Sequence, residues 1–109
     1  MADEIVNKAL EAIEIARKTG SIKKGTNEVT KNVERGVAKF VVYAGDVNPK
    51  EVIMHLPVIC KEKNVPVIEV PSKEELGAAA GLDVGTSSVA IIKEGDSKSI
   101  IEDIKKKLK

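Results

Sequence analysis

The residues best suited to chemistry lie together at the start of a predicted helix, in the run from Gly25 to Lys31. Val29 and Val33 are four residues apart, so they share one helical face and predict which side of the helix is buried. A second face then points outward, and its polar side chains are Asn27, Glu28, Lys31 and Arg35. An amide, a carboxylate and two cations beside a free helix N-terminus form a compact hydrogen-bonding surface.

These groups match the edges of RNA bases better than they match phosphate. Glu28 repels phosphate, so on an RNA-binding surface it needs a specific donor, and the N1–H and N2–H groups of guanine fit a carboxylate. Asn27 can both donate to and accept from base edges, and Lys31 can donate to guanine O6. The first-turn backbone N–H groups could bind phosphate or be capped by Thr26. A solvent-facing helix with a Glu28–Lys31 ion pair explains the same residues, and spacing alone does not choose between the two interpretations.

The sequence offers little for enzymatic chemistry. His55 is the single histidine and has no triad-like partner nearby, while Cys60 falls on an apolar helical stripe and is expected to pack as a small hydrophobe. The segment from Gly77 to Thr86 lacks the Walker spacing and lysine, and no HxxxH, DxD or CxxC pattern indicates a metal. We therefore expect no catalysis, cofactor or metal. The alternative from another class is a small metabolite-binding protein or enzyme that uses the loop from Gly81 to Thr86.

Length and composition indicate one soluble globular domain spanning residues 1–109. Hydrophobic residues make up 42% of the chain and charged residues 32%. No apolar run approaches the roughly 20 residues that a membrane-spanning helix needs. The acidic start from Met1 to Glu4 is unlike a signal peptide. We expect a cytoplasmic protein with no membrane partner.

Charge and aromatic content limit the kind of nucleic-acid binding that this chain could perform. The net charge is only +1, but residues 17–39 carry +5 and the remainder −4, so we expect one basic face. The two aromatic residues, Phe40 and Tyr43, fall in a predicted buried strand, which leaves no exposed platform for stacking single strands. Tight binding would therefore need hydrogen bonds to a structured RNA.

Apolar periodicity and capping residues predict alternating helices and strands. Asn48, Pro49 and Glu51 mark one helix start, Pro57 should kink that helix, and Ser72 begins another. The predicted elements are a helix at 4–18, a strand near Ile22, a helix ending near Arg35, a strand at 37–44, a helix at 49–63, a strand at 67–70, a helix at 73–80, a strand at 89–92 and a helix at 100–108. This alternation favours a mainly parallel sheet with helices on both faces.

The run Lys24-Gly25-Thr26-Asn27-Glu28-Val29-Thr30-Lys31, followed by Glu34-Arg35-Gly36, resembles the signature of the archaeal L-seven-Ae ribosomal protein family, whose members bind kink-turn RNA. Further stretches agree in family order. They are His55-Leu56-Pro57 with Cys60, Glu62-Lys63-Asn64-Val65-Pro66, Leu76-Gly77, Ala79-Ala80-Gly81 and Ser87-Ser88-Val89-Ala90-Ile91. The resemblance covers residues 4–108, so it extends over nearly the whole chain.

The resemblance implies an α/β fold: a single-domain, three-layer α/β/α sandwich around a central, mainly four-stranded mixed sheet. It also implies a binding protein rather than an enzyme. In a kink-turn, tandem sheared G·A pairs flank a sharp bend, and Asn27, Glu28 and Lys31 would contact the guanines of those pairs. The RNA-binding residues implied by the resemblance are Lys24, Gly25, Thr26, Asn27, Glu28, Lys31, Arg35, Lys73, Leu82, Asp83 and Val84.

The remaining implied residues would contact the RNA backbone and the bulge. Lys24 and Arg35 would support the phosphate backbone, and Lys73 would contact a further phosphate. Leu82 to Val84 match the loop that covers the extruded nucleotide of the bulge. Many family members have proline where this chain has Gly85.

The resemblance further implies a place in several ribonucleoprotein particles. Family members sit in the large ribosomal subunit, nucleate box C/D and box H/ACA guide-RNA particles and join ribonuclease P, which processes tRNA. The implied partners are rRNA, guide RNAs, ribonuclease P RNA and, in box C/D particles, a scaffold protein and a methyltransferase. A ribosomal protein restricted to its rRNA site is the alternative with the same fold. The exposed faces of the 49–63 helix and of the helix after Ser72 are candidate surfaces for partner proteins.

Overall fold

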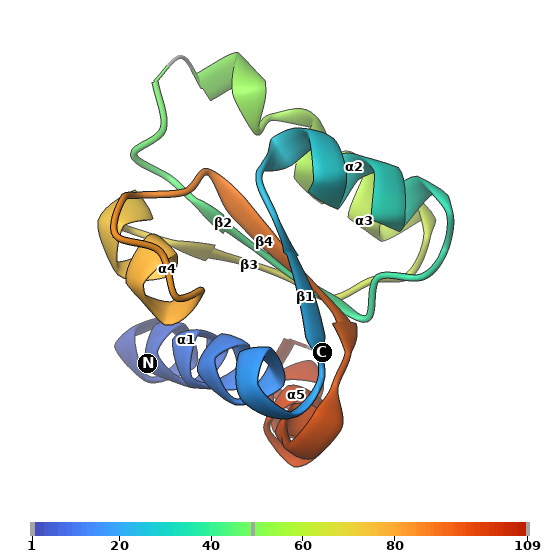
Figure 1. The fold of residues 1–109 in the computed structure, drawn as a ribbon. Helices are drawn as coiled ribbons and strands as arrows, with labels where there is room; N and C mark the ends of the chain where they lie inside the picture. Colours follow the sequence, from blue (N-terminus) through green and yellow to red (C-terminus); the bar gives the residue numbers. More distant parts are fainter. Residues whose placement is uncertain (1, 49, 109) are drawn as a thin grey trace.

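A computed structural model describes residues 2–48 and 50–108, in which helices alternate with the strands of a single sheet (Figure 1). In chain order the elements are α1 (Ala2–Thr19), β1 (Ser21–Lys24), α2 (Thr26–Glu34), β2 (Phe40–Ala44), the 3-10 turn η1 (Lys50–Val52), α3 (His55–Glu62), β3 (Val67–Val70), α4 (Lys73–Ala79), β4 (Ser88–Lys93), the 3-10 turn η2 (Gly95–Ser97) and α5 (Lys98–Leu108).

The sheet has four strands in the order β1-β4-β2-β3, and its pairing is mixed. β2 and β3 run parallel, whereas β4 is antiparallel to both β1 and β2. The four-stranded mixed sheet is confirmed, but the mainly parallel sheet favoured by the alternation of elements was wrong. A β4 parallel to β2 and β3 would have to begin at the opposite end of the sheet, so the segment after β3 would need to cross the whole length of the sheet. The chain after α4 instead stays at the end where α4 begins, so β4 starts there and runs the opposite way.

Helices cover both faces of this sheet, which confirms the three-layer α/β/α sandwich. α1 packs with α4 and α5 on one face, and α2 packs with α3 on the other (Figure 1). The fully buried apolar side chains come from both layers and the sheet: Ala9, Ala12, Ile13, Ala16, Val29, Val33, Phe40, Val41, Val42, Ala44, Leu56, Cys60, Leu76, Val89, Ala90, Ile91, Ile101 and Ile104. Val29 and Val33 are among them, so the α2 face predicted to be buried is buried.

The strand predicted at 37–44 begins later than expected, at Phe40. The N–H groups of Val37 and Ala38 both donate to the backbone oxygen of Asn32, at 3.1 and 3.3 Å. These bonds satisfy a carbonyl at the end of α2, so the chain there belongs to the helix terminus rather than to the sheet. Val37 is accordingly 40% exposed, although its sequence context is apolar.

The helix predicted at 49–63 is two elements, η1 and α3. Pro57 is the third residue of α3, where the backbone N–H would have no partner inside the helix, so it is accommodated in the first turn and the predicted mid-helix kink was wrong. Met54 is the N-cap of α3, and it provides no side-chain cap. The role predicted for Pro49, at the first helical position, lies outside the described residues.

Candidate nucleic-acid interface

Four chain segments converge at one end of the sheet. β2 and β3 are parallel and both end there, while β4 is antiparallel to β2 and therefore starts there. β1 is antiparallel to β4, so it also ends there and leads directly into α2. In Figure 1 the segment entering β4 passes between α4 and the start of α2. Loops gathered at one edge of a rigid sheet are a common place for binding residues.

The start of α2 is attached to the start of β4. Gly25 is the N-cap of α2 and has φ 89°, a left-handed conformation that favours glycine. Its N–H donates to the backbone oxygen of Ser88 at 2.9 Å, and the hydroxyl oxygens of Thr26 and Ser87 lie 2.7 Å apart. Thr26 therefore bonds to the residue before β4 instead of capping α2, and the N-cap provides no side-chain hydrogen bond. The first turn of α2 is left available to an external acceptor.

Three polar side chains on α2 are presented to solvent as the spacing predicted. Asn27, Glu28 and Lys31 are all exposed. Among the described residues, ion pairs join only charges of α1 and α5, so no Glu28–Lys31 pair forms. The interpretation of α2 as a helix with an internal ion pair is therefore wrong. The carboxylate and the ammonium group are each free to meet a ligand.

Two polar contacts lie beneath this exposed face of α2, one within the helix and one to α3. Asn32 is buried, and its Nδ2 donates to the backbone oxygen of Glu28 at 2.7 Å. Thr30 Oγ1 lies 2.7 Å from Nε2 of His55, which begins α3. His55 therefore joins the two helices of this layer, and this structural contact explains the histidine without a catalytic role.

The loop before β4 is fastened to the start of α4. The N–H of Thr86 donates to the backbone oxygen of Lys73 at 3.1 Å, and the N–H of Lys73 donates to Oδ1 of Asp46 at 2.9 Å. Ser72 caps α4 by accepting from the N–H of Glu75 at 3.2 Å, which confirms Ser72 as the residue that begins this helix. The position of Lys73 is thus set by hydrogen bonds to two other loops.

Gly77 allows this loop to lie directly on α4. A Cβ at Gly77 would come 2.1 Å from the backbone oxygen of Val84, so only glycine fits without moving the loop. The N–H of Leu82 donates to the backbone oxygen of Gly77 at 2.9 Å. Held in this way, the loop leaves Leu82 half-buried and Val84 71% exposed. An apolar side chain therefore projects into solvent from a fixed support.

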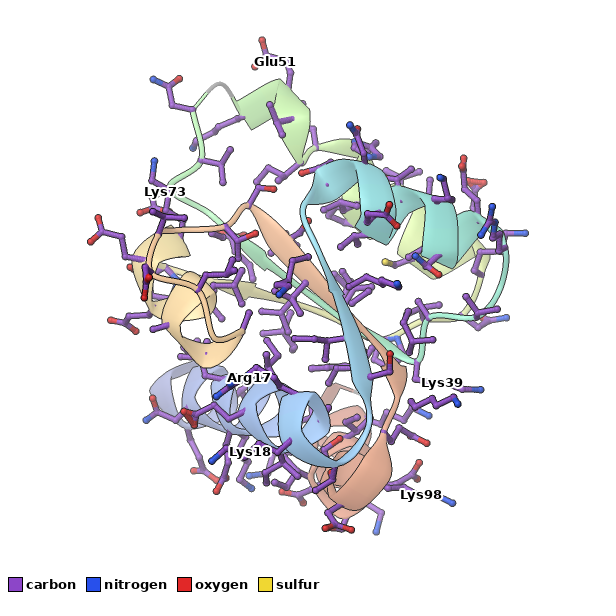
Figure 2. The ribbon with its side chains drawn as sticks, viewed as in Figure 1. Arg17, Lys18, Lys39, Glu51, Lys73 and Lys98 are labelled. Carbon is purple, nitrogen blue, oxygen red and sulfur yellow. The ribbon has the colours of Figure 1, made fainter. Side chains whose placement is uncertain are left out.

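The structure brings most, but not all, of the predicted residues together. Lys24, the run from Gly25 to Lys31, Lys73 and the run from Leu82 to Val84 all lie at the converging end of the sheet. Figure 2 shows Lys73 in the same upper part of the view as the start of α2. Arg35 is the C-cap of α2, about 12 Å along the helix axis from Asn27. Contact with Arg35 would require a ligand that extends along the helix.

The basic residues of the 17–39 segment do not form one face, contrary to the charge-based expectation. Lys24 and Lys31 are near the start of α2. Arg17 and Lys18 belong to α1, on the opposite face of the sheet, and Lys39 lies at the far end of the sheet (Figure 2). The site is therefore defined by a few placed groups rather than by a broad positive surface.

Two residues that support the site were not assigned this role from the sequence, Asp46 and Ser87. Ser87 bonds Thr26, and its backbone oxygen accepts from the N–H of Ala44 at 2.9 Å. Asp46 fixes Lys73. Their positions in the sequence could have indicated this role. Asp46 follows the strand predicted at 37–44 and Ser87 precedes the strand predicted at 89–92, and loops at the edge of a sheet often carry binding residues.

Cys60 is completely buried, as its place on the apolar stripe predicted. Burial raises the pKa of its thiol to about 11, so the reactive thiolate is scarce at neutral pH. Within residues 2–48 and 50–108, no group of three His, Cys, Asp or Glu side chains is placed to hold a metal ion.

Comparison with known proteins identifies the family of this chain. A solved structure described as the Giardia lamblia 15.5kD RNA binding protein superposes with a TM-score of 0.90 at 34% sequence identity, covering 95% of this chain and 87% of that one. The model of the ribosomal protein L7Ae/L30e/S12e/Gadd45 family matches residues 7–101. The chain therefore belongs to the ribosomal protein L7Ae/L30e/S12e/Gadd45 family.

Proposed function

We propose that this chain is a single-domain RNA-binding protein that recognises and stabilises kink-turns and related kink-loops. The observation that carries the proposal is the exposed set Asn27, Glu28 and Lys31, which has no ion pair among the described residues and lies at the same end of the sheet as the loop that carries the exposed Val84. Support also comes from a family named for ribosomal proteins and from a structural relative described as RNA binding.

Each group would have a distinct task on the RNA. Glu28 would accept from the N1–H and N2–H groups of a guanine, Lys31 would donate to guanine O6, and Asn27 would bond a neighbouring base edge. These contacts suit sheared G·A pairs, which leave the guanine edge unpaired by a Watson–Crick partner. Because such bonds form only with the bent RNA, binding shifts the RNA population toward the kinked state.

The loop and the lysines would hold the rest of the kink. Leu82 and Val84 would place an apolar wall against the extruded nucleotide, and a base face avoids water on such a surface. Lys24 and Lys73 would bind phosphates on either side of that nucleotide, while Arg35 would reach the backbone further along α2. Asp83, exposed between the two apolar residues, completes the proposed contact loop.

The proposed cellular targets are rRNA of the large ribosomal subunit, box C/D and box H/ACA guide RNAs, and ribonuclease P RNA. In box C/D particles the partners would be a scaffold protein and a methyltransferase. The alternative, a protein restricted to rRNA, is separated by competition. A guide-RNA kink-turn that displaces the rRNA element supports the broad assignment, and failure to displace it supports the restricted one.

The metabolite-binding or enzymatic alternative would need space beneath the loop from Gly81 to Thr86. That space is filled, since the backbone of Val84 lies against Gly77, and Gly85 lies against Lys73.

In the described part of the chain, no helix is both long enough and apolar enough to cross a bilayer.

A gel-shift titration with two short RNAs tests the proposal. One RNA carries tandem sheared G·A pairs beside a short bulge, and the other replaces those pairs with Watson–Crick pairs at the same length. We expect binding of the second to be weaker by about tenfold or more, because the guanine edges contacted by α2 are then occupied. Equal affinity for both RNAs, or binding to neither, contradicts kink-turn recognition.

A further inference from the structure

An open groove lies between α1 and α4, on the opposite face of the sheet from α2. It has a volume of about 930 Å³ and is lined by Glu4, Asn7, Lys8, Leu10, Glu11, Glu14, Glu75, Ala78 and Ala79. Figure 1 shows α4 and α1 adjacent in the layer below the sheet. None of the residues proposed to bind RNA is among the described residues that line this groove.

The floor of the groove is apolar, and both of its walls are acidic. Leu10 from α1 and Ala78 and Ala79 from α4 supply the floor, where the small alanines keep the groove open. Glu11 and Glu14 rise from α1, and Glu75 faces them from α4. All three side chains are exposed to water.

Lys8 is the one cation among the described residues that line the groove, and it is already engaged with carboxylates. Lys8 pairs with Asp103 of α5 and lies 3.5 Å from Glu4, which also pairs with Lys107 at 2.6 Å. In the described part of the chain, Glu11, Glu14 and Glu75 take part in no ion pair. The walls therefore present uncompensated negative charge on each side of an apolar strip.

We propose that this groove is a docking site for a basic amphipathic helix of a partner protein. Apolar side chains of that helix would cover Leu10, Ala78 and Ala79, and flanking arginines or lysines would meet the carboxylates on both walls. RNA is the wrong occupant, because its phosphates would be repelled by the same carboxylates. The proposal extends the predicted partner surface from the exposed face of α4 to a groove shared with α1.

The groove and the RNA surface share α4 but use different parts of it. Lys73, the first residue of α4, belongs to the RNA surface, whereas Glu75, Ala78 and Ala79 face the groove. A partner helix can therefore dock while RNA is bound. Its basic side would then lie next to the RNA, so a protein that contacts both components would be favoured.

The test uses short synthetic peptides and the ¹⁵N-labelled protein of residues 1–109 without RNA. One peptide combines leucines on one helical face with arginines on the flanks. The second has the same composition in scrambled order, and the third has glutamate in place of arginine. Amide NMR titration at low salt reports both the affinity and the location of binding. We expect only the first peptide to bind tightly, with shifts concentrated in residues 4–14 and 75–79.

Two matched triple variants separate docking from general charge attraction. Glu11→Gln, Glu14→Gln and Glu75→Gln remove the acidic walls and should weaken peptide binding about tenfold, as the loss of three exposed pairs would. Glu34→Gln, Glu51→Gln and Glu62→Gln change the net charge equally at exposed positions outside the groove and should leave binding nearly unchanged.

A further variant tests the apolar floor without changing charge. Ala78→Gln fills the groove with a polar side chain and should also weaken binding of the amphipathic peptide. Equal loss in both triple variants, shifts centred on α2, tight binding of the scrambled peptide, or no binding at all would overturn the proposal. RNA affinity of the variant with Glu11→Gln, Glu14→Gln and Glu75→Gln should match that of wild type, so the docking proposal and the RNA-binding proposal can fail separately.

Discussion

Charged side chains are used in opposite ways on the two sides of the sheet. Where α1 meets α5, Lys8 pairs with Asp103 and Glu4, and Lys107 pairs with Glu4. On α2, Glu28 and Lys31 are near enough in sequence to pair but do not, among the described contacts. The first set of charges joins two helices of the protein, and the second is available to a ligand.

The ion pairs between α1 and α5 also change the pKa values of the groups that they join. A hydrogen bond to Lys8 lowers the pKa of Asp103, and a hydrogen bond to Lys107 lowers the pKa of Glu4. The bond from Lys8 to Asp103 raises the pKa of Lys8. Charges that satisfy one another in this way have little left for a partner. Variants should therefore separate into those that change RNA affinity and those that change stability.

The largest contrast should come from salt. If four to six phosphates are contacted, log K for RNA should fall against log salt with a slope of about −4 to −5. RNA affinity would then fall by more than about a hundredfold between 50 and 200 mM salt. Exposed ion pairs contribute little to folding, so thermal unfolding should hardly move over that range. Filter binding and calorimetry in the same buffers measure both. A slope near −10 would mean that backbone charge dominates base recognition.

Removing the free charges of α2 should have the next largest effect. Glu28→Ala and Lys31→Ala should each weaken binding to the G·A-containing RNA by about 1–3 kcal/mol, the range for one good base contact. Stability should change by less than about 0.5 kcal/mol, since both side chains are exposed. Gel-shift titration and chemical unfolding give the two values.

A neighbouring carboxylate on the same helix provides the control for these variants. Glu34→Ala removes an equal charge from an exposed position near the end of α2, away from the converging loops. We expect it to leave RNA affinity nearly unchanged. If Glu34→Ala and Glu28→Ala had equal effects, Glu28 would be acting through net charge and not through a guanine.

The free surface of α2 was predictable because its cause is local. Val29 and Val33 determine the buried side of the helix, and that alone turns Asn27, Glu28 and Lys31 outward. The short apolar runs likewise predicted that β2 and β3 would be strands. Such features depend on residues a few positions apart, where helical and strand periodicities apply directly.

Features that depend on distant residues were not predictable in this way. The direction of β4 depends on how the chain leaves α4, and the bond between Thr26 and Ser87 joins residues 61 positions apart. The start of α3 depends on tertiary packing, because the local signals at Asn48 and Glu51 favoured an earlier one. The resemblance to a family supplied the mixed sheet, which periodicity could not.

Removing the hydrogen bond between Thr30 and His55, which lies beneath the exposed face of α2, should have a smaller effect, on stability. Thr30→Val keeps the side-chain shape but leaves Nε2 of the half-buried His55 without the Thr30 hydroxyl, so the free energy of unfolding should fall by about 1 kcal/mol. Thr30→Ser retains the hydroxyl and should lose less. Chemical unfolding measures both variants. A Thr30→Val variant as stable as wild type would show that water replaces the bond at no cost.

The smallest effect is expected where charges are already paired, at the contact of α1 and α5. Because the folded pKa of Asp103 lies below its ordinary value of 3.8, its stabilisation is present above that pH and is lost as pH falls through the lowered folded pKa. Asp103→Asn removes the pair with Lys8, so its stability should fall slightly at neutral pH and converge with wild type in acid. Added salt should shrink the difference, since both side chains of the pair are partly open to solvent.

Unfolding curves at several pH values measure this change, with Glu51→Gln as a control at a distant exposed position (Figure 2). RNA affinity should not change in the Asp103→Asn variant, because Asp103 belongs to α5, away from the converging end of the sheet (Figure 1). A stability difference that persists unchanged below the pKa of Asp103 would assign the effect of Asp103→Asn to packing. A loss of RNA affinity in that variant would show that the two sides of the sheet are coupled, against the separation of charges argued above.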